Sequence, residues 1–261
     1  SFALAAVGIP LLVYGFYTFN LGWIAQLGGS LVTGAVLAYS INIAFSISES
    51  KRMNVHAVFV FTATIWLLFN FTMFVLPQNS LYFLSLHAHL GLVGWFLLLV
   101  LGVGSRLIPM FLISKYSSPK LLWVVYLLVN AGLVLYGLLF LFRWSPSLSF
   151  IPAGMVLLAL LLFVYYCKQT YNERIRKKVD DQMKTSLLAV ALLLLPTLVL
   201  LALIGVLLTT SGAQTNVVLL YGFTIFFGWL TAIILGMTFK TLPFIVWNKV
   251  YRHRASMGKM P

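Results

Sequence analysis

The sequence predicts an all-α, polytopic membrane protein with about eight transmembrane helices. Hydrophobic residues make up 62% of the chain and charged residues only 8%, and the mean hydropathy is +1.03. These values lie outside the range of soluble globular proteins. Apolar runs long enough to cross a bilayer recur along the whole chain, and lysine and arginine collect beside alternate runs. Both features are typical of a multi-pass helical membrane protein.

The predicted helices follow from windows of about 17 to 25 apolar residues. They cover 2–18, 21–47, 54–76, 82–113, 120–142, 148–168, 184–209 and 216–247. The first apolar run begins directly after Ser1, so we interpret residue 1 as an internal start and expect further sequence upstream. The single cysteine, Cys167, excludes an intrachain disulfide and is expected to be a small apolar helix residue.

The formal charge of +13 is distributed on one side of the predicted membrane. The basic residues that follow the even-numbered helices are Lys51, Arg52, Lys115, Lys120, Lys168, Arg174, Arg176, Lys177, Lys178, Lys184, Lys249, Arg252, Arg254 and Lys259. The opposite side carries only Arg143. By the positive-inside rule, both ends of this chain are expected to be cytoplasmic, in the inner (plasma) membrane. The charge therefore indicates contact with the lipid bilayer and its anionic headgroups, and no nucleic acid.

The stretch from Ser85 to Phe111, SLHAHLGLVGWFLLLVLGVGSRLIPMF, holds two of the four histidines within an apolar run. Ionisable side chains at membrane depth are costly, so each needs a ligand, a partner or a wet cavity. His87 and His89 are about 200° apart on a regular helix and are expected to face different neighbours. They are either ligands to two separate sites or hydrogen-bonding residues at helix interfaces. The glycines that follow allow a flat macrocycle or another helix to approach closely.

Six positions of this stretch are in the register of a known motif, namely His87, His89, Gly94, Trp95, Gly102 and Pro109. In this spacing the stretch resembles the tenth helix of C-type oxidases, in the catalytic subunit I of the haem-copper oxidases and the related nitric oxide reductases. The resemblance implies that His87 is the axial ligand of a high-spin haem and His89 an axial ligand of a low-spin haem. It covers roughly one helix of the eight, and it implies b-type haem and electron transfer.

The last helix repeats the glycine, tryptophan and proline pattern of the Ser85–Phe111 stretch at an offset of 134 residues. The matching pairs are Gly94 and Gly228, Trp95 and Trp229, Gly102 and Gly236, Arg106 and Lys240, and Pro109 and Pro243. Because this period contains four helices, we expect two parallel four-helix repeats, 1–114 and 115–261, the second with a basic cytoplasmic tail. The positions of the histidines are taken by Tyr221 and Phe223 in the second repeat.

Three further residues are candidates for binding. Arg106 and Lys240 are expected near the inner ends of their helices, where they either reach the headgroup layer or bind an anion such as lipid phosphate or a quinone headgroup. His56 opens its helix at the cytoplasmic face, ~25 Å or more from the His87 end, and cannot share its metal. It is either an interfacial histidine bonded to backbone or lipid, or a ligand to a second haem.

Two functions remain open from the sequence. Oxygen or nitric oxide reduction in the resembled family needs more histidines than His87 and His89, the two expected in the outer half of the membrane. The apolar spans also contain no Asp or Glu. We therefore expect no complete oxidase from this chain alone. The first hypothesis is a haem-binding subunit that moves electrons through His87 and His89 with other membrane subunits of a redox complex. The second is a haem-free scaffold, assembly factor or small-molecule carrier in a larger complex.

Overall fold

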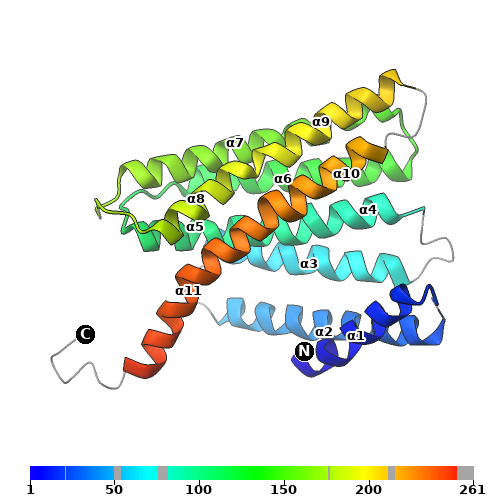
Figure 1. The fold of residues 1–261 in the computed structure, drawn as a ribbon, viewed down its shortest axis with the longest axis horizontal. Coiled ribbons are helices and arrows are strands. Elements are labelled where there is room, and N and C mark those ends of the chain that lie inside the picture. The colour runs from blue at the N-terminus through cyan, green and yellow to red at the C-terminus, as the bar shows by residue number, and fades with distance from the viewer. Residues whose placement is uncertain (21, 50–53, 76–81, 176, 211–214, 252–261) are drawn as a thin grey trace. The chain divides into compact units, whose positions relative to one another are not determined.

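The computed structural model describes residues 1–20, 22–49, 54–75, 82–175, 177–210 and 215–251, and every regular element in these ranges is a helix (Figure 1). The helices are α1 (Phe2–Tyr17), α2 (Trp23–Ser48), α3 (Val55–Val75), α4 (Leu84–His89), η1 (Leu90–Leu97), α5 (Leu98–Leu112), α6 (Pro119–Leu141), η2 (Pro146–Ser149), α7 (Phe150–Asn172), α8 (Asp181–Leu192), α9 (Leu194–Thr209), α10 (Thr215–Phe223), η3 (Thr224–Leu230) and α11 (Thr231–Tyr251). Elements that follow one another directly form longer helical rods, so α4, η1 and α5 make one rod from Leu84 to Leu112.

Six of the described rods are long and apolar enough to cross a membrane, which confirms the prediction of a multi-pass all-α membrane protein. They are Trp23–Ser48, Leu84–Leu112, Pro119–Leu141, Pro146–Asn172, Asp181–Thr209 and Thr215–Val250. Two shorter apolar helices, Phe2–Tyr17 and Val55–Phe71, coincide with the first and third predicted spans. Eight complete spans therefore stay a prediction.

The rod that begins at Asp181 starts earlier than the predicted 184. The main-chain oxygen of Asp180 accepts hydrogen bonds from the amides of Met183 and Lys184, both at 3.1 Å, and these bonds begin the helix. Asp181 in the first turn complements the positive end of the helix dipole. A hydropathy window excludes such a polar first turn, which is why the predicted boundary lies further along the chain.

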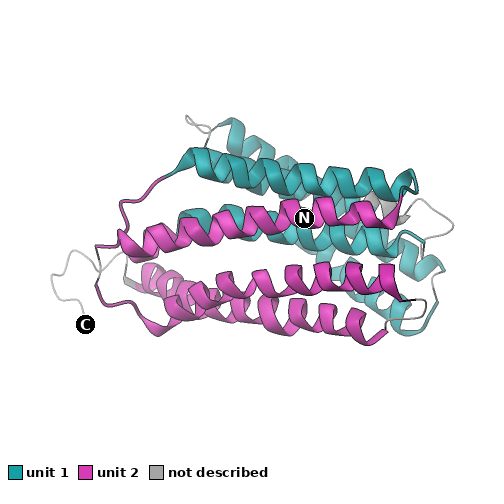
Figure 2. Cartoon of the chain, turned by 90° about the horizontal axis from the view of Figure 1, so that it is seen from above, with its two compact units in different colours: residues 1–107, 118–144 teal, residues 108–117, 145–261 magenta. Residues whose placement is uncertain are grey.

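The chain divides into two compact units (Figure 2). Unit 1 consists of residues 1–107 and 118–144, and unit 2 of residues 108–117 and 145–261. The boundary falls within α5, and α6 belongs to unit 1 although the predicted repeat boundary at 114/115 assigns it to the second half. The division into two sequence repeats stays a prediction.

Unit 1 is organised around α3. This helix packs against α2, η1 and α6, while α1 packs against α2. Two hydrogen bonds join α3 to α6: Thr62 and Tyr126 share one between their hydroxyl oxygens at 2.8 Å, and Trp66 Nε1 donates to Asn130 Oδ1 at 2.9 Å. Interhelical hydrogen bonds of this kind hold helices together where lipid removes the hydrophobic driving force.

Unit 2 is held by contacts of α11 with α8, and of α9 with α7 and α10. The backbones of α11 and α8 approach closely, because a Cβ atom at Gly236 would lie 2.9 Å from Ser186 Oγ and 3.1 Å from its main-chain nitrogen. Phe163 and Met183 are fully buried in this unit.

Both units contain a π-helical segment. The segments η1 and η3 begin at Leu90 and Thr224, which are 134 residues apart, the same offset that relates the two glycine-tryptophan motifs. A π-helix inserts an extra residue into a turn and is found mostly as short segments, often at functional sites.

Candidate functional site

His87 and His89 lie in the last turn of α4, directly before the π-helix η1. Both side chains are half-buried. Because η1 redirects the side chains that follow, the histidines stand where the helical register of the rod changes. This is the structural context of the candidate ligands in unit 1.

The ring of His87 faces α3, where it hydrogen-bonds to the main chain of Asn70. The Asn70 side chain is 4% exposed, and its Oδ1 atom has no hydrogen-bond partner within the described part of the chain. The Nδ2 atom would lie 3.0 Å from a Cβ at Gly91, so only glycine at this position leaves the carboxamide its present room. Sequence reasoning missed Asn70, whose signal was an amide within an apolar run.

His89 faces α6 instead. Its Nδ1 atom lies 2.8 Å from the main-chain oxygen of Ser85, and its ring centroid lies 5.0 Å from that of Tyr136. The Tyr136 and Ser85 hydroxyl oxygens share a hydrogen bond at 2.9 Å. The prediction that the two histidines face different neighbours is confirmed.

The hydrogen bond of His89 also determines its tautomer. A carbonyl oxygen can only accept, so Nδ1 carries the proton and donates it to Ser85. In the neutral ring the lone pair is then on Nε2. Metal-binding histidines commonly have this arrangement, with one ring N–H given to a carbonyl and the other nitrogen directed to the metal.

The glycines of the rod are used for close helix packing. A Cβ at Gly94 would lie 2.7 Å from Leu133 Cδ2 and 2.9 Å from Trp66 Cγ, and one at Gly102 would lie 2.6 Å from Phe59 Cβ. Side chains of α3 and α6 thus fill the space over these glycines. Of the two expected uses of this surface, the structure shows the helix contact, and the approach of a macrocycle stays a prediction.

A haem and a free metal ion need different numbers of ligands from the protein. Within the described ranges, no three His, Cys, Asp or Glu side chains lie close enough together to hold a metal ion. A haem supplies four nitrogen ligands of its own and needs only axial ligands from the protein. His89, with its lone pair on Nε2, is the residue that fits this role.

His56 lies at the other end of α3 and has a partner that the sequence did not indicate. Its Nδ1 atom lies 2.6 Å from Ser105 Oγ, and the Ser105 hydroxyl donates to the oxygen of Gly102 at 2.8 Å. His56 is therefore the donor to Ser105. Along α3 it is 14 residues from the Asn70 position that contacts His87, which is about 21 Å at 1.5 Å per residue. Its role as a ligand to a second haem stays a prediction.

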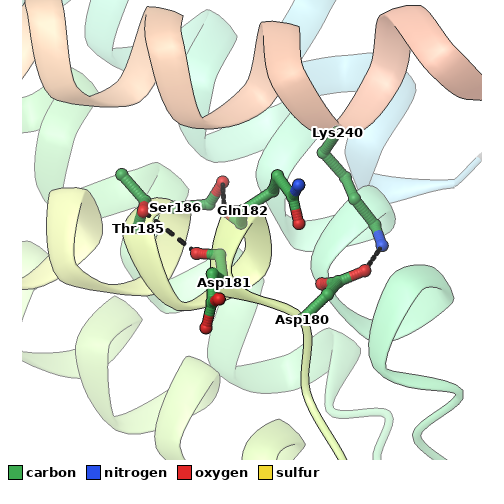
Figure 3. A network of polar contacts seen from close by, with 6 residues as sticks. All are labelled: Asp180, Asp181, Gln182, Thr185, Ser186 and Lys240. Carbon is green, nitrogen blue, oxygen red and sulfur yellow. Dashed lines mark hydrogen bonds and ion pairs between the residues drawn. The ribbon is translucent and has the colours of Figure 1, made fainter.

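Arg106 and Lys240, the matched cations of the predicted repeat, have different environments. Arg106 is exposed in unit 1, close enough to His56 for their charges to interact. The Lys240 side chain is only 14% exposed in unit 2, where it forms an ion pair with Asp180 (Figure 3). Its Nζ atom lies 5.2 Å from the centroid of the Phe111 ring. An internal carboxylate thus occupies Lys240, while the anion or quinone role of both cations stays a prediction.

Comparison of the chain with models of protein families, with curated proteins and with solved structures finds no match in any of the three. The likeness to the haem-copper oxidases therefore rests on the residues of the Leu84–Leu112 rod.

Proposed function

We propose that this chain is a haem-binding subunit of a respiratory-type membrane complex, related to subunit I of the haem-copper oxidases, and that it carries electrons. The observation that most directly supports the proposal is the hydrogen bond from His89 Nδ1 to the Ser85 carbonyl. It keeps the proton on Nδ1, so that the lone pair of the neutral ring is on Nε2, the nitrogen that would bind iron.

The haem would lie on the His89 side of the rod. On the other side, a macrocycle would have to displace Trp66 and Phe59 from the glycine surface. On the His89 side, Tyr136 belongs to an aromatic group with Phe83 and Phe140, which offers the apolar walls that a porphyrin needs. A bound b-type haem would supply one-electron chemistry, and His89 would hold it.

His87 would have a smaller part in this arrangement than the resemblance implies. Its ring bonds to the main chain of Asn70 on α3, and Trp66 of the same helix fills the space over Gly94, so a second haem on this side would have to displace that side chain. The remaining ligands and the electron donor would come from other membrane subunits of the complex.

In the membrane, the chain would cross eight times as two parallel four-helix repeats, with both ends cytoplasmic in the inner (plasma) membrane. Three observations support this topology: six membrane-length rods and two shorter apolar helices among the described residues, the one-sided lysines and arginines, and the two π-helices at the offset of 134 residues. Reporter fusions at residue 175 and in the loop near Arg143 test it, because they should report opposite sides.

A haem-free scaffold or carrier is the second candidate, and a specific observation favours it. Gly94 and Gly102 pack against α3 and α6 as in a purely structural helix contact, and Trp66 and Asn130 satisfy one another within it. In that case the histidines serve only as interhelical hydrogen-bonding groups.

A visible spectrum of the purified protein, with haem quantified as its pyridine complex, separates the two candidates. The haem proposal expects about one b-type haem per chain, with a sharp band in the reduced α region, after expression with a haem supply. The scaffold expects neither. A protein that remains folded but takes up no haem in detergent or in membranes would overturn the first proposal.

A further inference from the structure

Two connecting segments of unit 2 pair with one another. Ser114, after α5, and Arg174, after α7, form an isolated antiparallel bridge, and the amide of Ile175 donates to the oxygen of Ile113 at 3.1 Å. The Ser114 hydroxyl also accepts from the amide of Tyr116 at 3.2 Å. These bonds hold the backbone of Arg174 in place, although it lies between helices.

The guanidinium of Arg174 is held in a defined position as well. Its centre lies 3.8 Å from the centroid of the Tyr171 ring, and Nη1 donates to the Tyr171 main-chain oxygen at 2.6 Å. The Nε atom is buried and has no acceptor among the described residues. A buried charged donor without an acceptor destabilises the folded protein, so a ligand that supplies an acceptor would be stabilising. The planar guanidinium, held in one orientation, is suited to bind two oxygens of a carboxylate or phosphate.

The charges around Arg174 favour an anion from outside the chain. Lys177 and Lys178 are exposed and follow within four residues. Of the nearby acids, Asp180 forms an ion pair with Lys240, and Asp181 with Lys184 at 2.8 Å.

The remaining acid, Glu173, is opposite the exposed Lys115 in the register of the antiparallel bridge. Two of the three carboxylates near Arg174 are thus paired with a lysine, and the third lies opposite one in the bridge register. The segment keeps an excess of positive charge for a ligand.

The position of the segment indicates which anion it meets. It connects α7 and α8, and both belong to rods long enough to cross a membrane, so it lies at a membrane face, at the level of the lipid headgroups. We propose that Arg174, with Lys177 and Lys178, binds the phosphate of an anionic phospholipid headgroup. This site lies outside the histidine site and does not depend on haem.

The test uses the full chain in a neutral detergent and measures bound lipid by native mass spectrometry, with the melting temperature as a second readout. Phosphatidylglycerol should bind at least about tenfold more tightly than phosphatidylcholine, which has the same phosphate but no net charge. Arg174→Gln should weaken phosphatidylglycerol binding by about tenfold or more, the usual loss for a hydrogen bond to a charged group. Arg174→Lys should weaken it less, because the charge remains but the fork is lost.

Arg143→Gln is the matched control, because Arg143 also lies over a tyrosine ring, that of Tyr82 at 5.5 Å, in unit 1. It should bind phosphatidylglycerol like the unmodified protein. Equal losses in the two Gln variants, or equal binding of the two lipids, would overturn the proposal. If Arg174→Gln does not fold, unchanged binding by Arg174→Lys would overturn the role of the fork. Stabilisation by millimolar inorganic phosphate but not by phosphatidylglycerol would overturn the lipid as the source of the phosphate.

Discussion

The Nδ1 atom of His89 lies 2.8 Å from the main-chain oxygen of Ser85, one turn earlier on α4. The acceptor is a main-chain atom, so the orientation of the ring is built into the helix and does not depend on a second side chain. Two positions earlier, the ring of His87 is bonded to a different helix, α3, through Asn70. The two histidines therefore direct their rings to different neighbours, and only the ring of His87 is tied to another helix.

This difference predicts an unequal effect of the two alanine variants. His89→Ala should lower the haem content per protein by at least about tenfold. Even the loss of a group that only hydrogen-bonds to a metal ligand lowers metal affinity by about that factor, and His89 would be the ligand itself. His87→Ala should retain most of the haem. The measurement is haem per protein after purification, by pyridine haemochrome, with His56→Ala as the control that leaves both positions intact. Equal haem content in the His87 and His89 variants would contradict the assignment.

A side chain added at Gly102 should disturb the contact between α5 and α3 and lower the free energy of unfolding. A Cβ there would lie 2.6 Å from Phe59 Cβ, an atom that cannot rotate away, so Gly102→Ala should destabilise the protein by about 1–3 kcal/mol. Gly137 on α6 is the matched control, because nothing lies within 4 Å of its Cβ position. Gly137→Ala should be neutral or slightly stabilising, since alanine favours helix. Unfolding in detergent, followed by circular dichroism, measures both. Equal stability of the two variants would mean that α3 does not occupy this surface.

The helical rods could be predicted from the sequence because the length of an apolar run is a local property. The boundaries agree within two residues for 54–76, 82–113 and 120–142. They differ by three or four residues where polar residues belong to the helix, at Asp181 and at the ends of α7 and α11. The separate directions of His87 and His89 also follow from local geometry, since two residues on a helix differ by about 200°.

The partners of the candidate residues could not be predicted in the same way. Ser105 as the partner of His56, Asn70 as the partner of His87 and Asp180 as the partner of Lys240 are all distant in sequence. Each depends on how neighbouring helices pack, which no local pattern specifies. The π-helix η1 after His89 belongs to the same class, because a π-helix depends on the packing of the whole rod.

The hydrogen bond from Trp66 to Asn130 predicts a measurable coupling between α3 and α6. Trp66→Phe and Asn130→Ala in a double-mutant cycle should give a coupling of about 0.6 kcal/mol, and at most about 1.7 kcal/mol, the range for such bonds in membranes. Asn130→Ala alone should cost more, about 1–3 kcal/mol, because it leaves the part-buried indole N–H of Trp66 without its acceptor. The free energy of unfolding of the four proteins measures the cycle. Thr62→Val with Tyr126→Phe provides a second pair between the same helices, and strictly additive effects in the Trp66 cycle would refute the bond.

Because Lys240 and Asp180 form an ion pair, replacing either one alone should destabilise the protein more than replacing both. The side chains are 14% and 29% exposed, so each loses much of its hydration but keeps some contact with solvent. Removing one partner takes away the attraction of the pair, while the other charge stays partly buried. A fully buried pair would lose about 3–5 kcal/mol in this way, whereas an exposed pair contributes little, so an intermediate loss of about 1–3 kcal/mol is expected here.

Lys240→Met and Asp180→Asn should therefore each lower the melting temperature, and the double variant should recover part of the loss, because Met can pack on the Phe111 ring that Lys240 now covers. The matched control is Lys184→Met, whose pair with Asp181 is exposed, and it should leave the melting temperature unchanged. Salt tests the same difference, since 0.5 M NaCl screens exposed charges more strongly than partly buried ones. The destabilisation by Lys240→Met should thus persist at high salt. If the double variant were no more stable than the worse single variant, Lys240 and Asp180 would contribute to the stability of unit 2 independently. The attachment of α11 to the start of α8 would then depend on the close contact of Gly236 with Ser186.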